Sequence, residues 1–98
     1  KVNPEEIEKI VKILDPIEEA VAIGIEHQIF GKVIKLLVKK YEGSEIDIST
    51  IISHCKQNLE RFKIPIKVEF VSNFPKNEHG KIIRFILQEK NNGNNKDA

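Results

Sequence analysis

Apolar and charged positions in the first part of the chain recur with the period of a helix. Asn3 suits the capping position ahead of such a helix, and Pro4 suits its first turn. Pro16 ends it, because the residue before a proline avoids the helical conformation. Between these signals we expect a helix with one apolar face, formed by Ile7, Ile10, Val11 and Leu14.

The pattern then changes to alternation, which is typical of strands. Within residues 17–25, large and small apolar side chains alternate from Ala20 through Ile25. This predicts a strand with one face of large residues and one face of small residues. Residues 33–39 alternate as well and predict a second strand, and residues 41–44 have the composition of a turn.

The second half of the chain predicts three further elements. Asp47 suits the capping position of a second helix, and Pro65 breaks the chain before a third strand at residues 66–71. A polar loop follows at 73–80, and a short last helix is expected at 82–87. The second helix has its apolar positions at Ile51, Ile52, Cys55, Leu59 and Phe62.

The order helix, strand, strand, helix, strand, helix predicts an α+β domain in which helices flank a small three-stranded sheet. The 98 residues are enough for one domain. We expect it to span residues 1–90, with a disordered polar tail at 91–98. Because the chain contains no methionine, we also expect it to be a piece of a longer polypeptide.

Composition argues against several classes of partner and site. Sixteen Lys and Arg residues face fifteen Asp and Glu residues, so no strong overall field attracts nucleic acid or an anionic membrane. No apolar stretch is long enough to span a bilayer. The single cysteine fits a reducing compartment, so we expect a cytoplasmic protein. His27, His54 and His79 lack the spacing of metal ligands, so no metal site is predicted.

Three segments near the end of the chain carry the most specific pattern. Residues 62–65 read FKIP, residues 68–71 read VEFV, and residues 74–84 read FPKNEHGKIIR. Gly80-Lys81 in the last segment is not a phosphate-binding P-loop, because Ile82 replaces the required Ser or Thr. Outside this context, Lys81 would be interpreted as an ordinary solvated lysine.

The three segments closely resemble the end of the adenylate-forming superfamily, which includes acyl-CoA synthetases, adenylation domains of peptide synthetases, and luciferases. That family commonly reads YKxP, then VxFV, then LPKTxxGKIxR. Residues 2–8 resemble the helix after the family's interdomain hinge, and residues 18–25 resemble its VxGV strand. The chain departs from the family pattern at residues 26–27, at residues 77–79, and at Phe85, where a basic residue is usual.

The resemblance implies the mobile C-terminal domain of an ATP-dependent carboxylate ligase, similar to acyl-CoA synthetases. In this family a carboxylate attacks the α-phosphate of ATP, and a thiol of CoA or of a carrier-protein pantetheine then takes the acyl group. The resemblance assigns the catalytic lysine of the first step to Lys81. It places Gly80, Lys76, His79 and Arg84 near the substrate or nucleotide. ATP and Mg²⁺ would be bound mainly by an N-terminal adenylation domain, which the chain does not contain.

A lysine suits this step because its ammonium offsets the repulsion between two anions as they approach. The chain alone is expected to be inactive, since it has no nucleotide-binding loop or acyl pocket of its own. Two alternatives stay open: a ligase that loads carrier proteins, and a non-catalytic small α+β interaction module. Near-neutral charge and the absence of a basic stripe count against nucleic acid as a partner.

Overall fold

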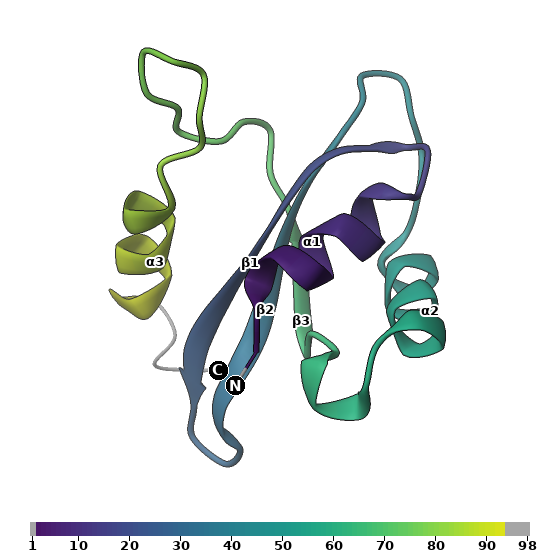
Figure 1. The fold of residues 1–98 in the computed structure, drawn as a ribbon, viewed down its shortest axis with the longest axis vertical. Coiled ribbons are helices and arrows are strands. Elements are labelled where there is room, and N and C mark those ends of the chain that lie inside the picture. The colour runs from purple at the N-terminus through teal and green to yellow at the C-terminus, as the bar shows by residue number, and fades with distance from the viewer. Residues whose placement is uncertain (1, 94–98) are drawn as a thin grey trace.

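The computed structural model describes residues 2–93. The elements follow the predicted order, which confirms the α+β class (Figure 1). A single 3₁₀ turn at Arg61–Lys63 separates the second helix from the third strand. The helices and strands are α1 (Pro4–Lys12), β1 (Ile17–His27), β2 (Gly31–Lys40), α2 (Ile48–Asn58), β3 (Lys67–Phe70) and α3 (Arg84–Gly93).

The three strands form one mixed sheet in the order β1-β2-β3. β1 and β2 form an antiparallel hairpin in which Val21 lies opposite Leu37. β3 pairs with β2 in parallel, with Val68 opposite Leu36. Parallel neighbours need a crossover connection, and α2 lies within that crossover.

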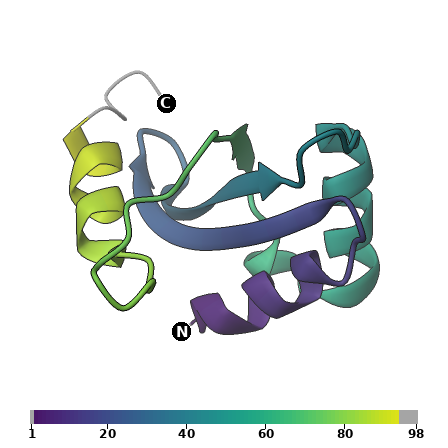
Figure 2. The same cartoon turned by 90° about the horizontal axis from the view of Figure 1, so that it is seen from above.

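Helices cover both faces of the sheet. Figure 2 shows α1 and α2 on one side and α3 on the other. On the first side, the small residues Ala20 and Ala22 of β1 pack in one cluster with Ile7 and Val11 of α1. Cys55 of α2 is buried in the same cluster, and burial raises the pKa of its thiol.

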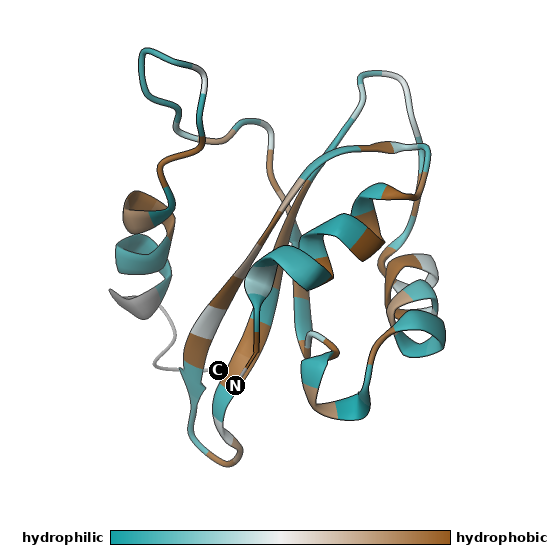
Figure 3. Cartoon of the chain, in the orientation of Figure 1, coloured by the Kyte–Doolittle hydropathy of each residue, from teal (hydrophilic) through white to brown (hydrophobic). Residues whose placement is uncertain are grey.

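The opposite face of β1 carries the large side chains that the alternation predicted. Its cluster contains Val21, Ile23, Ile25, Leu37, Phe74 and Leu87. Phe74 belongs to the loop between β3 and α3, and Leu87 belongs to α3, so both attach this last part of the chain to the sheet. Figure 3 shows that the loop is hydrophilic along most of its length and becomes hydrophobic just ahead of α3.

Side chains from two helices bind the backbone of β1, the strand at one edge of the sheet. The N–H of Ala22 donates to Oε2 of Glu8 in α1 at 2.8 Å. The carbonyl of Gly24 accepts from Nε2 of Gln88 in α3 at 2.5 Å. The edge of β1 is therefore covered by polar side chains from both faces.

The last helix differs from its predicted bounds. α3 begins at Arg84, and Ile82 instead forms an antiparallel bridge with Lys76. The helix continues to Gly93, so residues 91–93 of the expected tail are helical, and residues 94–98 lie outside the described residues. Asn91 stabilises this extension, because its Nδ2 donates to the carbonyl of Leu87 at 2.8 Å and its Oδ1 accepts from Nζ of Lys35 at 2.6 Å.

Candidate functional site

Residues 76–82 form a small projecting hairpin, called here the Lys81 hairpin. Its two sides are joined by the bridge between Lys76 and Ile82 and by the Asn77 N–H, which donates to the Lys81 carbonyl at 2.9 Å. The Gly80 N–H donates to the Asn77 carbonyl at 3.0 Å and closes the turn. In Figure 1 this segment extends from the body of the domain at the end of the sheet opposite the β1–β2 turn.

Asn77 and Gly80 explain why the Lys81 hairpin forms a tight turn. The Asn77 side chain accepts from the N–H of His79 at 2.8 Å and from the N–H of Lys81 at 3.0 Å. Gly80 has a φ of +81°, which side chains other than glycine rarely adopt. No heavy atom lies within 4 Å of a Cβ built at Gly80, so the requirement for glycine is conformational.

The backbone of Lys81 is fixed while its ammonium is free. Its N–H donates to the Asn77 side chain, and its carbonyl accepts from the Asn77 N–H. The side chain is exposed and makes no ion pair or hydrogen bond with any residue of the described part of the chain. A compact cation on a flexible stem is thus presented outward from a well-defined turn.

The other predicted site residues have different environments. Lys76 lies in the same hairpin, but its Nζ forms an ion pair with Oε2 of Glu19 at 2.9 Å. His79 is exposed at the tip, with Nε2 3.7 Å from Oε2 of Glu78. The hairpin therefore brings Lys76, His79, Gly80 and Lys81 together.

Arg84 does not point to the hairpin tip. Its Nη2 donates to Oε1 of Glu8 at 2.5 Å, and this bond raises the pKa of Arg84. Only 8% of the Glu8 side chain is exposed, and its second oxygen accepts from Ala22 of β1. Arg84 thus connects the start of α3 to α1 and to the edge of the sheet.

The sequence profile of the AMP-binding enzyme C-terminal domain family matches residues 6–81. The chain belongs to this family. The match includes most of α1, the whole sheet and the hairpin as far as Lys81. The match ends before α3.

Individual relatives agree with this assignment. The chain is 38% identical over 89 residues to a long-chain-fatty-acid–CoA ligase of Haemophilus influenzae, which covers 91% of this chain and 16% of the relative. It is 34% identical to the oxalate–CoA ligase of Saccharomyces cerevisiae, with coverage of 91% and 16%. The ATP-bound crystal structure of MatB from Rhodopseudomonas palustris superposes with a TM-score of 0.90 at 30% identity, covering 97% of this chain and 19% of that one.

The chain therefore spans less than one fifth of the length of these relatives. The two ligases are named for very different acids, although their identities to this domain are similar. Similarity over the C-terminal domain consequently assigns the family and does not distinguish one acid from another.

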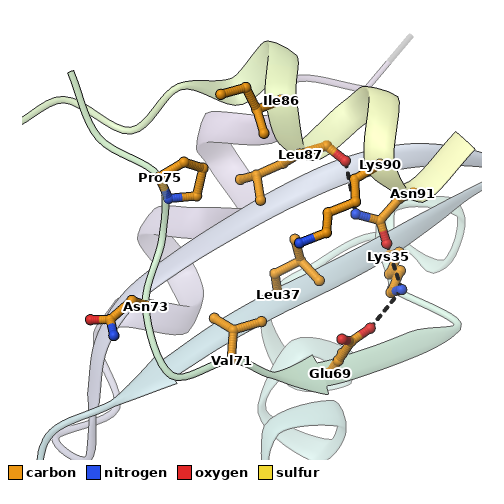
Figure 4. A pocket seen from close by; sticks show the side chains of 10 residues that line it. All are labelled: Lys35, Leu37, Glu69, Val71, Asn73, Pro75, Ile86, Leu87, Lys90 and Asn91. Carbon is orange, nitrogen blue, oxygen red and sulfur yellow. Dashed lines mark hydrogen bonds and ion pairs between the residues drawn. The ribbon is translucent and has the colours of Figure 1, made fainter.

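A hollow lies beside the hairpin of this C-terminal domain. It has a volume of about 410 Å³ and separates the segment leading into the hairpin, at Asn73 and Pro75, from α3 and the sheet (Figure 4). The buried Lys35 borders it, held by Glu69 at 2.7 Å and by Asn91. The remaining lining residues are Leu37, Val71, Ile86, Leu87 and Lys90.

Neither a metal site nor a membrane span is found in the described part of the domain. Residues 2–93 contain no group of three or more His, Cys, Asp or Glu side chains that could hold a metal ion. The hairpin itself presents cations, which do not fit Mg²⁺ as ligands. No helix within the same residues has both the length and the apolar character needed to cross a membrane.

Sequence reasoning missed Asn77, Glu19 and Glu8. Asn77 had a local signal, since an Asn placed before a glycine-containing turn commonly bonds to the backbone beyond it. Glu19 and Glu8 had no such local signal in the sequence. Each is far in sequence from the cation that it binds, and only the folded sheet brings the partners together.

Proposed function

We propose that this chain is the mobile C-terminal domain of a cytoplasmic, AMP-forming carboxylate–CoA ligase, and that Lys81 is its catalytic residue. One observation carries the proposal: the Lys81 ammonium is free and exposed on a rigid turn of a domain that belongs to this family. ATP with Mg²⁺ and the acid would be bound mainly by an N-terminal adenylation domain, against which this domain moves.

In the first step, a carboxylate oxygen of the acid bonds to the α-phosphorus of ATP. The bond between the α-phosphorus and the bridging oxygen breaks, and pyrophosphate leaves. Both reacting groups are anionic, so negative charge accumulates between them. The Lys81 ammonium would bind both with charge-assisted hydrogen bonds, which are strongest in a closed, water-poor cleft. His79 and Gly80 would then lie beside the nucleotide.

In the second step, the thiol sulfur attacks the acyl carbon of the adenylate. AMP leaves with the electrons of the broken acyl–oxygen bond, and the thiol proton passes to solvent. Lys81 is not needed here, and the domain would withdraw it by repositioning. The relatives described above are named as CoA ligases, which supports CoA as the acceptor. A carrier-protein pantetheine presents the same thiol and can be compared with CoA directly.

Lys81→Ala in the full-length enzyme tests this assignment. Carboxylate-dependent exchange between ATP and pyrophosphate should fall by about a hundredfold or more, because a contact made in the transition state is lost. Thioester formation from preformed acyl-adenylate and CoA should stay close to wild type. Lys9→Ala, which removes an exposed lysine from α1, serves as the matched control and should leave both reactions unchanged.

Two results would contradict the proposal. Unchanged exchange in Lys81→Ala would remove Lys81 from the chemistry. An equal loss in both steps would indicate a damaged protein or a role outside adenylate formation.

A further inference from the structure

The ion pair between Lys76 and Glu19 joins the Lys81 hairpin to the sheet. Nζ of Lys76 lies 2.9 Å from Oε2 of Glu19, and their side chains are 40% and 21% exposed. Glu19 lies in β1, next to the irregularity in its pairing with β2. The second carboxylate oxygen of Glu19 is buried and has no partner among residues 2–93, so Lys76 supplies the compensating charge for this group.

Ile82 packs the end of the hairpin against the core cluster, and the pair between Lys76 and Glu19 holds its beginning to the sheet. The hydrogen bonds within residues 76–82 set the shape of the turn but leave its angle to the sheet open. Phe74 anchors the entering segment in the core, and Arg84 anchors the exit on Glu8. Between these anchors, Pro75 borders the hollow of about 410 Å³, so close packing does not fix the hairpin on that side (Figure 4).

We propose that Glu19 and Lys76 are positioning residues, which hold the Lys81 hairpin at the angle that delivers Lys81 during acyl-adenylate formation. This inference rests on the function proposed above. A displacement of about 1 Å at a reacting group can cost about a hundredfold in rate. The Glu19 carboxylate is only 21% exposed, so its attraction to the Lys76 ammonium is less screened than that of a pair in which both groups lie on the open surface.

The test uses the full-length enzyme with three variants of this pair. Lys76→Met and Glu19→Met each remove the ion pair while keeping a long side chain. Each should lower kcat for the exchange reaction by about tenfold to a hundredfold, with little change in KM for ATP or for the acid. Thioester formation from preformed adenylate should stay within about twofold. Lys76→Arg keeps the charge and should recover most of the lost exchange activity.

The double variant adds a stricter condition. If both residues act through one interaction, combining Glu19→Met with Lys76→Met should cost no more than the larger single effect. Lys32→Met is the control, because it breaks a 3.3 Å ion pair with Glu26 beside the β1–β2 turn, at the end of the sheet opposite the hairpin. It should leave both half-reactions unchanged.

Several results would overturn the inference. An unchanged kcat in Lys76→Met would do so, and so would a parallel fall in both half-reactions. A raised KM for ATP in Lys76→Met without a matching effect in Glu19→Met would assign Lys76 to direct nucleotide contact. The outcome for Lys81→Ala separates the two proposals: if that variant loses exchange and the pair variants do not, only the positioning role is wrong.

Discussion

Lys76 and Lys81 carry the same ammonium group within one hairpin, yet their surroundings differ. Lys76 is bound by Glu19, whereas the Lys81 side chain is unpaired within residues 2–93. An ammonium already neutralised by a carboxylate has less charge to offer a ligand. At the scale of single residues, this difference supports the proposal that Lys81 acts in the chemistry and Lys76 positions the hairpin.

Gly80→Ala should impair catalysis by distorting the turn that presents Lys81. An alanine at a φ of +81° costs about 1 kcal/mol, because left-handed backbone crowds its Cβ. Gly43 provides a matched control, since its φ is +83° and no atom lies within 4 Å of a Cβ built there. Both variants should lower the thermal midpoint of the domain by similar amounts, measured by circular dichroism, and only Gly80→Ala should reduce exchange activity. Equal activity in the two variants would contradict a special role for the turn.

The motif led to Lys81 and its glycine as candidate site residues, but it could not predict that two neighbouring cations would be bound by carboxylates. Lys76 and Arg84 were both expected near the substrate or nucleotide. Their partners, Glu19 and Glu8, lie in elements far earlier in the chain. Nothing in the local pattern indicates that a lysine or an arginine will be bound by a carboxylate after folding.

At the scale of elements, polar capping residues define where two of the helices begin. Asn3 accepts from the N–H of Glu5 at 3.0 Å ahead of α1, and Asp47 accepts from the N–H of Thr50 at 2.9 Å ahead of α2. Hydrogen bonds from Thr50, and then from Ser49, hold the pKa of Asp47 below its usual value. The cap of α2 is therefore most favourable when Asp47 is ionised.

Asp47→Ala should destabilise the domain in a pH-dependent way. Because the pKa of Asp47 is lowered by folding, its contribution is fully present above the pKa of the unfolded chain and is lost as pH falls through the folded pKa. Urea unfolding should show a wild-type advantage at neutral pH that shrinks below about pH 4. Glu45→Ala removes a nearby exposed carboxylate as a control, and its effect should not follow this pH profile. A constant difference between wild type and Asp47→Ala at all pH values would contradict the charged cap.

The elements differ in how well the sequence predicted them, and the difference has a physical basis. The starts of α1 and α2 were predicted well because their caps are local signals. The expected extent of α2 was wrong: the helix ends at Asn58, and Phe62, expected on its apolar face, lies exposed in the 3₁₀ turn that follows. The bounds of α3 were wrong because Asn91 favours loops, and its helical conformation depends on Lys35 of β2 and on the Leu87 carbonyl. The parallel pairing of β3 with β2 likewise depends on contacts between distant parts of the chain, and the alternation of apolar and polar residues within a strand does not specify it.

At the scale of the whole molecule, the domain is a sheet covered on both faces, with Lys81 exposed at one projecting turn. Lys81 does not line the hollow beside α3, nor the hollow between α1 and α2. Lys81 faces outward instead, which suits a group that acts inside the cleft of another domain.

The isolated 98-residue chain should therefore show no carboxylate-dependent ATP–pyrophosphate exchange. The full-length enzyme, assayed at the same concentration and with the same acids, provides the positive control. Exchange by the isolated chain above the level of a Lys81→Ala version of it would contradict the proposal that a partner domain binds the substrates.

The covering of the sheet edges also affects how copies of the domain meet one another. An open edge strand can recruit a strand from a second molecule and begin β-aggregation. Here Glu8 and Gln88 occupy backbone groups of β1, and the opposite edge is a strand of four residues bearing exposed Lys67 and Glu69. For the mobile domain proposed above, this covering would limit self-association whenever the domain separates from its partner domain.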